Sequence, residues 1–290
     1  MNAVKTRNTA LDTTELPYIV TEMNYGTKLP GVDRYRYDTV ERARTNLVLE
    51  TRPVRVYDVT SRSSGLSFQD NGFEVQTHHS QFAQLANDES VAREDFLLKL
   101  RHDYQQEMAG FIRTLSGSLH VYPQPIGFFV RHGRKSKVKT PQRPAALPHV
   151  DFTPETANAM ARMIRDECAP GLQFRHFAIY QTWRTVAAPP QDNVLCFCNP
   201  ATATVEDFKL VESIMGPEDV PGNVYKMQMG LFSPSHEWFY FSGLTASDVL
   251  VFQGYDTRHP CPVLHTSVEN PVPGAAPRVS IECRHYAFFE

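Results

Sequence analysis

The chain has 290 residues, of which 41% are hydrophobic and 21% charged, and its net charge is −3 with histidine neutral. This composition is typical of a soluble globular protein and too apolar for general disorder, and so small a net charge favours neither nucleic acid nor an anionic membrane as a partner. No apolar run approaches the roughly 20 residues of a membrane helix, and the N-terminus lacks the pattern of a secretion signal.

The first half of the chain is predicted to mix strands with two helices. Residues 54–59 are predicted as a short strand, and residues 119–130 form a long apolar run. Residues 88–116 are predicted as a helix, because apolar residues recur at steps of three and four, and such a stripe is typical of core packing. A second helix is predicted within residues 151–168, since Pro154 suits a first helical position.

From residue 172 onward the chain is predicted to be almost entirely strand. The segments are rich in β-branched and aromatic residues and are separated by turn formers. They cover residues 172–186, 193–199, 223–233, 236–242, 248–256, 263–268 and 278–289. This order does not match the βαβ alternation of nucleotide-binding domains. We therefore expect an all-β core with flanking helices, folded as a double-stranded β-helix, the cupin-like jelly roll.

We divide the chain at residue 50. Residues 1–50 are polar and irregular, and we interpret them as an N-terminal arm packed on a domain formed by residues 51–290. Residues 131–143 are basic, with six lysines and arginines and no acid. This tract is interpreted either as a solvated loop, which is the default, or as a lid that attracts an anionic substrate.

The cysteines indicate the compartment. There are five, an odd number, and no CxxC pair occurs. A disulfide framework and a four-thiolate zinc site are therefore poor interpretations. Cys196 and Cys198 share one strand face and are predicted to be buried thiols. We expect a cytoplasmic protein.

One short motif places two types of metal ligand on the same side of a strand. His149-Val150-Asp151 is the only HxD in the sequence, and residues i and i+2 of a strand project to one face. Iron(II) outside haem is commonly held by two imidazoles and one carboxylate, with the remaining positions open. The motif alone is weak, but His265 on a later strand completes the set. The alternatives are structural histidines and a helix-capping role for Asp151.

A still later strand carries an arginine that requires an explanation. In RVSIECR, Arg278, Ser280, Glu282 and Arg284 share one face, and an unpaired buried guanidinium is costly. A dicarboxylate co-substrate supplies a reason. 2-Oxoglutarate chelates a metal through its keto-acid end, and its far carboxylate can accept hydrogen bonds from Arg278 and the Ser280 hydroxyl. The alternative is that Arg278 or Arg284 forms an ordinary salt bridge with Glu282 or Glu269.

Five stretches together resemble a known family. They are RPAALPHVDFT (143–153), YQTWRTV (180–186), HEWFYFSGLTASDVLVFQGYDT (236–257), LHTSVENP (264–271) and RVSIECR (278–284). The sequence is similar to the natural-product oxygenases that include gibberellin desaturase-like proteins, cephalosporin 7-methoxylation proteins and meroterpenoid oxygenases of the novofumigatonin type. The resemblance extends from about residue 72 to the C-terminus. It implies a double-stranded β-helix that uses Fe(II), 2-oxoglutarate and O2.

On this resemblance His149, Asp151 and His265 are the iron ligands, and Arg278 binds 2-oxoglutarate. Two departures, WRTV where the family often has WRP and CFCN where an acidic residue often ends the run, bear on the identity of the substrate. We predict an Fe(II)- and 2-oxoglutarate-dependent oxygenase that hydroxylates, desaturates or oxidatively cyclises a small-molecule secondary metabolite or its precursor.

Three further residues are candidates for contact with substrate. Arg184 is predicted to reach the substrate or the co-substrate carboxylate, with a salt bridge at the rim as the alternative. Trp183 and Trp238 are predicted to supply aromatic walls for a largely apolar metabolite. The expected partner is a small molecule, with no nucleic acid and no membrane, and a homodimer is compatible with the sequence. His78 and His79 are not expected to share a metal, because adjacent strand residues point to opposite faces.

Two other classes of function remain open on the sequence. A cupin-like isomerase or hydrolase would use the three ligands with another divalent metal and would not need Arg278. A binding protein, or the inactive partner of an oxygenase pair, would tolerate His149→Ala. Because all three ligand types are present, an inactive copy is the weaker of these two alternatives.

Overall fold

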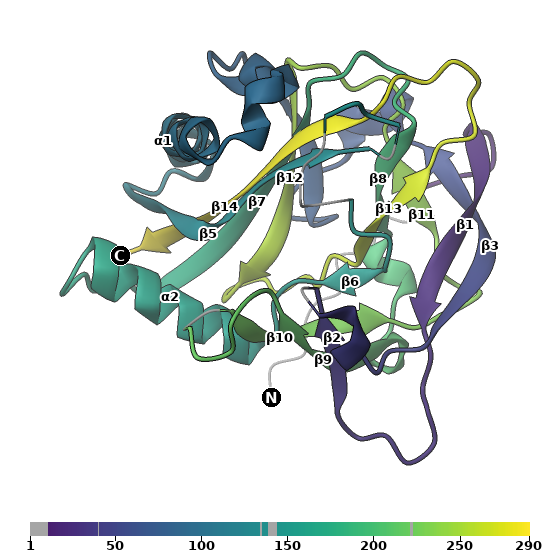
Figure 1. Cartoon of the computed structure of the whole chain (residues 1–290), viewed down its shortest axis with the longest axis horizontal. Helices are drawn as coiled ribbons and strands as arrows, with labels where there is room; N and C mark the ends of the chain where they lie inside the picture. Colours follow the sequence, from purple (N-terminus) through teal and green to yellow (C-terminus); the bar gives the residue numbers. More distant parts are fainter. Residues whose placement is uncertain (1–10, 40, 134, 139–143, 221–222) are drawn as a thin grey trace.

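Two β-sheets pack face to face and form the body of the molecule (Figure 1). The computed structural model describes residues 11–39, 41–133, 135–138, 144–220 and 223–290. In these ranges the larger sheet has nine strands, in the order β1-β3-β11-β8-β13-β6-β10-β9-β2. The smaller sheet has five, in the order β4-β12-β7-β14-β5. The predicted all-β core with two flanking helices is confirmed.

The bounds of the elements are as follows. The larger sheet contains β1 (Tyr18–Gly26), β2 (Tyr35–Asp38), β3 (Leu49–Asp58), β6 (His149–Val150), β8 (Asn193–Cys198), β9 (Phe208–Ile214), β10 (Val224–Gly230), β11 (Trp238–Tyr240) and β13 (His265–Glu269). The smaller sheet contains β4 (Phe73–Thr77), β5 (His120–His132), β7 (His176–Thr185), β12 (Asp248–Asp256) and β14 (Val279–Phe289). The helices are α1 (Glu94–Ser116) and α2 (Pro154–Cys168). Short 3-10 helices lie at Arg42–Arg44, Thr60–Gly65, Ala83–Asn87, Glu89–Ala92, Pro200–Thr202 and Val205–Asp207.

Side chains alternate along the smaller sheet and separate two cores. On β12, Val249 and Val251 belong to the core beneath α1, whereas Leu250 and Phe252 belong to the core between the sheets. Phe197 of β8 meets the inner core from the larger sheet. Burial of each such side chain contributes about 1.5–3 kcal/mol. The same alternation decides which residues of β7 and β14 face the space between the sheets.

Helix α1 begins later than the periodicity of its apolar residues predicts. The expected range was 88–116, but the helix starts at Glu94. Asp88 instead caps a 3-10 turn, where its carboxylate accepts a hydrogen bond from the Ser90 main-chain nitrogen at 2.7 Å. The helix ends at Gly117, whose φ of +73° lies in the left-handed region that favours glycine.

The first 50 residues contain two regular strands. β1 pairs antiparallel with β3, and β2 pairs parallel with β9. The expectation of an irregular segment is therefore wrong for these two stretches. β1 buries Ile19, Met23 and Tyr25, but polar residues lie between them. Apolar and polar residues therefore do not alternate regularly along β1, and the sequence pattern did not indicate a strand. The division of the chain at residue 50 stays a prediction.

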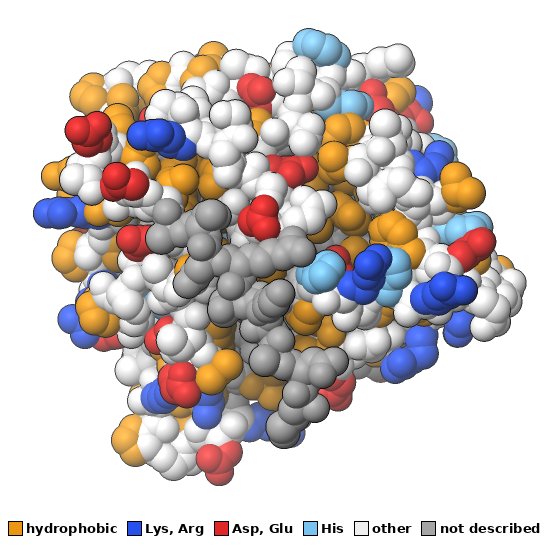
Figure 2. Space-filling view, turned by 180° about the vertical axis from the view of Figure 1, so that it is seen from behind, with side chains coloured by type: hydrophobic (Ala, Val, Ile, Leu, Met, Phe, Trp, Pro, Cys, Tyr) orange, Lys and Arg blue, Asp and Glu red, His pale blue; other side chains and the backbone are white. Residues whose placement is uncertain are grey.

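In the part of the chain that the structure describes, the face opposite to that of Figure 1 carries both acidic and basic side chains. Acidic and basic side chains are interspersed there among polar and hydrophobic ones (Figure 2), as the net charge of −3 suggests. Within the described ranges, no helix combines the length and the apolar character needed to cross a membrane.

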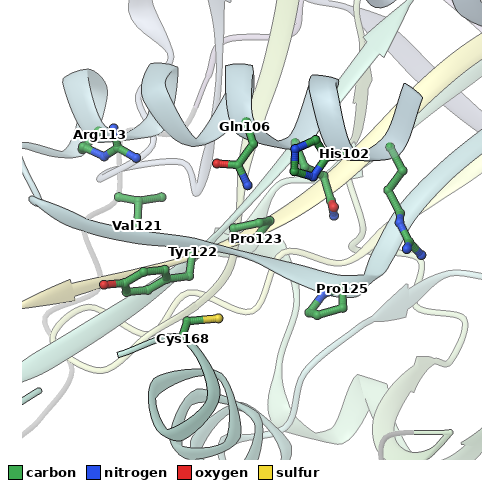
Figure 3. Close-up of a pocket in the computed structure, with 10 residues that line it drawn as sticks. His102, Gln106, Arg113, Val121, Tyr122, Pro123, Pro125 and Cys168 are labelled. Atoms are coloured by element: carbon green, nitrogen blue, oxygen red, sulfur yellow. The ribbon is translucent and has the colours of Figure 1, made fainter. Parts of the chain in front are cut away.

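A cleft of about 360 Å³ lies between α1 and β5 (Figure 3). His102, Gln106 and Arg113 line it from α1, and Tyr122 and Pro123 line it from β5. A second hollow, of about 440 Å³, adjoins the same helix. Both lie on the side of the smaller sheet that carries α1, and none of the residues proposed as metal ligands lines either of them.

The thiols offer a test of the packing. Cys196, Cys198 and Cys283 are at most 1% exposed, which confirms the prediction of buried thiols at the first two positions. Burial raises the pKa of all three, that of Cys198 to about 12. A thiol-reactive reagent is therefore expected to modify the exposed Cys168 in the native protein and the three buried cysteines only after unfolding. Equal modification rates for all of the cysteines under native conditions would contradict this packing.

Candidate metal centre

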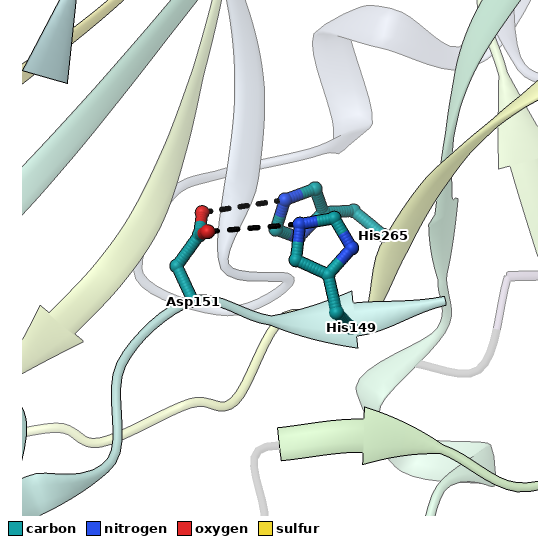
Figure 4. Close-up of side chains that lie close together, drawn as sticks. All are labelled: His149, Asp151 and His265. Carbon is teal, nitrogen blue, oxygen red and sulfur yellow. Dashed lines mark ion pairs between the residues drawn. The ribbon is translucent and has the colours of Figure 1, made fainter. Parts of the chain in front are cut away.

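The register of the larger sheet brings two histidines together. The short strand β6 lies between β10 and β13, and His149 pairs directly with His265 across the ladder. Their ring centroids are 4.4 Å apart. Asp151 follows β6 at the i+2 position and faces the same side, so the three side chains converge (Figure 4). The structure thus brings together the three ligands that the sequence predicted.

The donor atoms of these residues lie at distances that suit one metal ion. His149 Nε2 is 3.6 Å from Asp151 Oδ1, and His265 Nε2 is 3.5 Å from Asp151 Oδ2. One ligand atom from each residue can be chosen such that all three lie within 4.8 Å of one another. A metal with ligand bonds of about 2 Å fits between donors at such separations.

Main-chain carbonyls fix the tautomer of both rings. His149 Nδ1 donates to the Leu147 carbonyl at 2.7 Å, and His265 Nδ1 donates to the Val263 carbonyl at 2.9 Å. Because a carbonyl can only accept, Nδ1 of each ring carries a proton. The lone pair of each Nε2 is then directed at the partner ligands, as in metal-binding histidines.

His149 and Asp151 are in the protonation states that a metal requires. Burial, with His265 close by, lowers the pKa of His149 to about 4, so this imidazole is neutral at pH 7. Burial alone would raise the pKa of Asp151, but Arg284 and the two histidines outweigh it and hold that pKa well below its usual value. A neutral imidazole and an ionised carboxylate are the ligand forms that bind metal without first losing a proton.

Helix α2 leaves Asp151 free for this role. Thr153, not Asp151, caps the helix, because its hydroxyl accepts from the Thr156 main-chain nitrogen at 3.1 Å. Pro154 occupies the first turn, as predicted. The capping alternative for Asp151 is therefore excluded.

Arg284 is a site residue that the sequence reasoning missed. It was considered only as a partner of Glu282 or Glu269, whereas its Nη2 donates to Asp151 Oδ1 at 2.8 Å. Its Nε donates to Gln181 Oε1 at 3.0 Å. The inward face that it shares with Arg278 was the available signal, but Asp151 is 133 residues away in the chain, and only the fold reveals the contact.

The guanidinium of Arg284 lies between two aromatic rings. Its Cζ is 5.4 Å from the centroid of Phe129 and 5.3 Å from that of Phe152. Stacked in this way, Arg284 can hold one carboxylate oxygen of Asp151 and leave the other for a metal.

Arg278 is 1% exposed, and side chains accept hydrogen bonds from every one of its guanidinium nitrogens. Nε donates to Ser280 Oγ at 3.0 Å, Nη1 to Ser267 Oγ at 2.6 Å and to Asn193 Oδ1 at 3.0 Å, and Nη2 to Glu282 Oε1 at 3.0 Å. Burial lowers its pKa to about 10, so the group remains charged at pH 7. The salt bridge to Glu282 that the sequence left open is present.

A second contact connects Arg278 to the metal ligands. Ser267, which binds Arg278, is two residues beyond His265 on β13 and therefore projects from the same face. Two strand residues span about 7 Å. Arg278 thus contacts β13 two residues beyond His265, and about 7 Å is a length that a five-carbon dicarboxylate can span.

Trp183 faces the space between the sheets, and its role as a wall for the substrate stays a prediction. It belongs to the core between the sheets, and its ring centroid is 5.1 Å from Arg278 Cζ. Its Nε1 is buried and has no hydrogen-bond partner among the described residues. An indole N–H in this position is free to donate to a bound ligand.

Arg184 lies on the opposite face of β7, and the prediction that it reaches substrate is corrected. It is fully buried beneath α1, where it donates to the Tyr104 hydroxyl at 3.0 Å, to the His78 carbonyl at 2.7 Å and to the Ala246 carbonyl. Adjacent strand residues face opposite sides, so the inward position of Trp183 excludes an inward Arg184.

Replacing Arg184 with methionine is expected to lower the free energy of unfolding by roughly 3 kcal/mol, since hydrogen bonds from a charged donor contribute about 1.5–3 kcal/mol each and two buried carbonyls lose this donor. Chemical denaturation of the variant measures the change. A loss below about 1 kcal/mol would contradict the structural role assigned to this arginine.

Trp238 also faces away from the metal ligands, which corrects its assignment to the substrate. It packs in the core formed with β1, and its Nε1 donates to the Tyr25 hydroxyl at 2.8 Å. Its neighbour Phe239 belongs instead to the core between the sheets. The strand was predicted correctly, but which of its residues face inward was not.

The basic tract of residues 131–143 lies only partly in the described chain. Arg131 Nε donates to Glu282 Oε2 at 2.9 Å near the end of β5. Residues 134 and 139–143 lie outside the described residues. The lid interpretation of this tract stays a prediction.

The two packed sheets carry a buried cluster of two histidines and one aspartate that could hold one metal ion. The chain belongs to the family described as oxidoreductase/YMDC permease-like domain, whose model matches residues 20–288. This match spans both sheets and both helices.

Named relatives and solved structures agree with this assignment. The chain is 26% identical to the hydroxylase/desaturase efuI of Hormonema carpetanum, over 94% of this chain and 96% of the relative. It is 23% identical to the hydroxylase/desaturase CTB9 of Cercospora beticola, over 83% and 78%. A structure of the iron and alpha-ketoglutarate-dependent endoperoxidase NvfI matches with a TM-score of 0.78 and 21% identity, over 93% of this chain and 97% of that one. These matches confirm the predicted fold, and the names of the relatives and of the structural neighbour agree with the resemblance that the sequence indicated.

Proposed function

We propose that the protein is an Fe(II)- and 2-oxoglutarate-dependent oxygenase that acts on a small-molecule secondary metabolite. One observation carries the proposal: His149, Asp151 and His265 converge, and Ser267, on the same face of β13 as His265, accepts a hydrogen bond from the buried Arg278. The relatives are named hydroxylase/desaturase, and the structural neighbour is named as dependent on iron and alpha-ketoglutarate.

The residues present fit the metal. His149, Asp151 and His265 would hold it, since each Nε2 lone pair is left available and the carboxylate is ionised. Two imidazoles and one carboxylate form the ligand set typical of iron(II) oxygenases and leave three positions open. Arg284 would orient Asp151 by occupying one of its oxygens.

The residues present also fit the co-substrate. Around Arg278, the hydroxyls of Ser267 and Ser280 accept hydrogen bonds from the guanidinium and donate none within the described residues. The N–H of Trp183 is likewise unused. Unused buried donors around a charged guanidinium are suited to a carboxylate. Arg278 and Ser280 would hold the distal carboxylate of 2-oxoglutarate, and Trp183 would line the pocket.

Bound iron and 2-oxoglutarate together supply the activation of O2 for C–H oxidation. The residues of the chain position the substrate and exclude water from the metal centre. Phe197 and Phe252 lie against the ring of His265, with centroids 6.4 and 4.9 Å away, and keep that side of the centre apolar. Hydroxylation, desaturation and oxidative cyclisation are all compatible with this arrangement.

The test is coupled turnover. Protein loaded with Fe(II) under ascorbate is screened with amino-acid, terpenoid and polyketide panels, and succinate and O2 uptake are measured together. We expect one substrate class to trigger equal formation of succinate and consumption of O2. Conversion of a substrate without either would instead indicate a redox-neutral isomerase or hydrolase.

Two further expectations belong to this proposal. Free cysteines in the described chain suit a reducing cytoplasm, and we place the enzyme there. A homodimer remains the proposed alternative to a monomer, and sedimentation of the purified protein distinguishes them.

A further inference from the structure

Glu282 lies between the two functional halves of the inner face of β14. The side chains of residues 280, 282 and 284 project from this face, and Arg278, directly before the strand, continues the same pattern. Arg278 lies on one side of Glu282, and Arg284, which binds Asp151, lies on the other. A ligand that joins Arg278 to the metal ligands must therefore pass beside the Glu282 carboxylate.

The carboxylate bridges two arginines with one oxygen each. Oε1 accepts from Arg278 Nη2 at 3.0 Å, and Oε2 accepts from Arg131 Nε at 2.9 Å. Its side chain is 24% exposed. Burial by itself would raise the pKa of Glu282, but the two arginines outweigh it and lower that pKa.

The hydrogen-bond donors of Arg278 show what this contact competes with. Nε is used by Ser280, and both hydrogens of Nη1 are used by Ser267 and Asn193. Only Nη2 remains for an incoming carboxylate, and Glu282 already accepts one of its two hydrogens. Two carboxylates at one Nη2 would also repel each other.

We propose that Glu282 is an internal carboxylate that competes with the co-substrate for Arg278 Nη2 and thereby sets co-substrate affinity and selectivity. The inference rests on the proposed function. When the dicarboxylate binds, its distal carboxylate replaces Glu282 on Arg278, while Glu282 keeps its bond to Arg131. A keto acid without a distal carboxylate leaves the Glu282–Arg278 pair in place. Glu282 is thus a positioning residue whose effect depends on the distal group of the ligand.

The experiment is calorimetric titration of Mn(II)-loaded wild type and Glu282→Gln with two ligands. One is 2-oxoglutarate, and the other is 2-oxopentanoate, which has a methyl group in place of the distal carboxylate. The uncharged amide competes weakly, so Glu282→Gln is expected to bind 2-oxoglutarate about tenfold more tightly and 2-oxopentanoate unchanged. Weaker binding of 2-oxoglutarate, or an equal change for both ligands, would overturn the inference.

A matched control shows whether the effect of Glu282→Gln comes from losing the Glu282–Arg278 pair or from losing any ion pair. Glu212, on β9, accepts two hydrogen bonds from the guanidinium of Arg34, and the Glu212 side chain is 20% exposed. Glu212→Gln is expected to leave both affinities within about twofold. If the wild type fails to bind 2-oxoglutarate, the proposed function itself is rejected, whereas binding by the wild type without tightening in Glu282→Gln rejects this inference alone.

A second measurement does not depend on the variant folding. In a crystal structure of the wild type with Mn(II) and 2-oxoglutarate, the Glu282 carboxylate is expected to contact Arg131 alone, with Arg278 Nη2 on the co-substrate. A Glu282–Arg278 contact that persists at hydrogen-bond distance in that complex would overturn the proposal.

Discussion

Replacing His265 with alanine is expected to abolish stoichiometric iron binding and 2-oxoglutarate turnover. The variant keeps His149 and Asp151 but loses the ligand on β13 that faces them across the ladder. Changes to outer-shell partners of a metal cost about 10–100-fold in affinity or activity, and loss of a direct ligand is expected to exceed that range. Metal content after gel filtration and succinate formation measure the effect.

The control for this change is His176→Ala. His176 stacks on Phe289, with ring centroids 4.2 Å apart, at the far end of β7. It donates nothing to the proposed centre, so iron content and turnover should match the wild type. Iron retained at one per chain in His265→Ala would remove His265 from the ligand set.

Replacing Arg278 with glutamine is expected to raise the dissociation constant of 2-oxoglutarate by about 10–100-fold while metal affinity stays within twofold. A hydrogen bond to a charged group contributes about 1.5–3 kcal/mol, and each 1.4 kcal/mol corresponds to tenfold in affinity. The metal ligands are on other strands and keep their own partners. Titration of Mn(II)-loaded protein separates the two affinities.

Arg184→Lys is the matched control for Arg278→Gln. Both arginines are at most 1% exposed, but they lie on opposite faces of the smaller sheet. Arg184→Lys should lower the melting temperature without changing the affinity for 2-oxoglutarate. An unchanged affinity in Arg278→Gln would exclude Arg278 as the anchor of the co-substrate.

The convergence of His149, Asp151 and His265 could be predicted because their geometry is local or follows strand periodicity. His149 and Asp151 are two residues apart, and a period of two places them on one face whatever the register. His265 had only to lie on a later inward strand position. These three inferences need no knowledge of which strand pairs with which.

The remaining residues depend on register and on contacts between distant segments. Trp183 and Arg184 are neighbours, and only the packing of α1 decides that the tryptophan faces inward and the arginine outward. Trp238 was misplaced because the packing of β1 decides, in the same way, which residues of β11 face inward. Arg284, which contacts Asp151, lies at a register shift between β14 and β5, and neither spacing nor composition indicates this contact.

The most direct test of the whole account is anomalous diffraction at the iron edge from crystals grown anaerobically with Fe(II) and 2-oxoglutarate. A single iron peak is expected about 2.1 Å from His149 Nε2, His265 Nε2 and one Asp151 oxygen, with the co-substrate extending toward Arg278. An iron peak elsewhere, or none between these three residues, would contradict it.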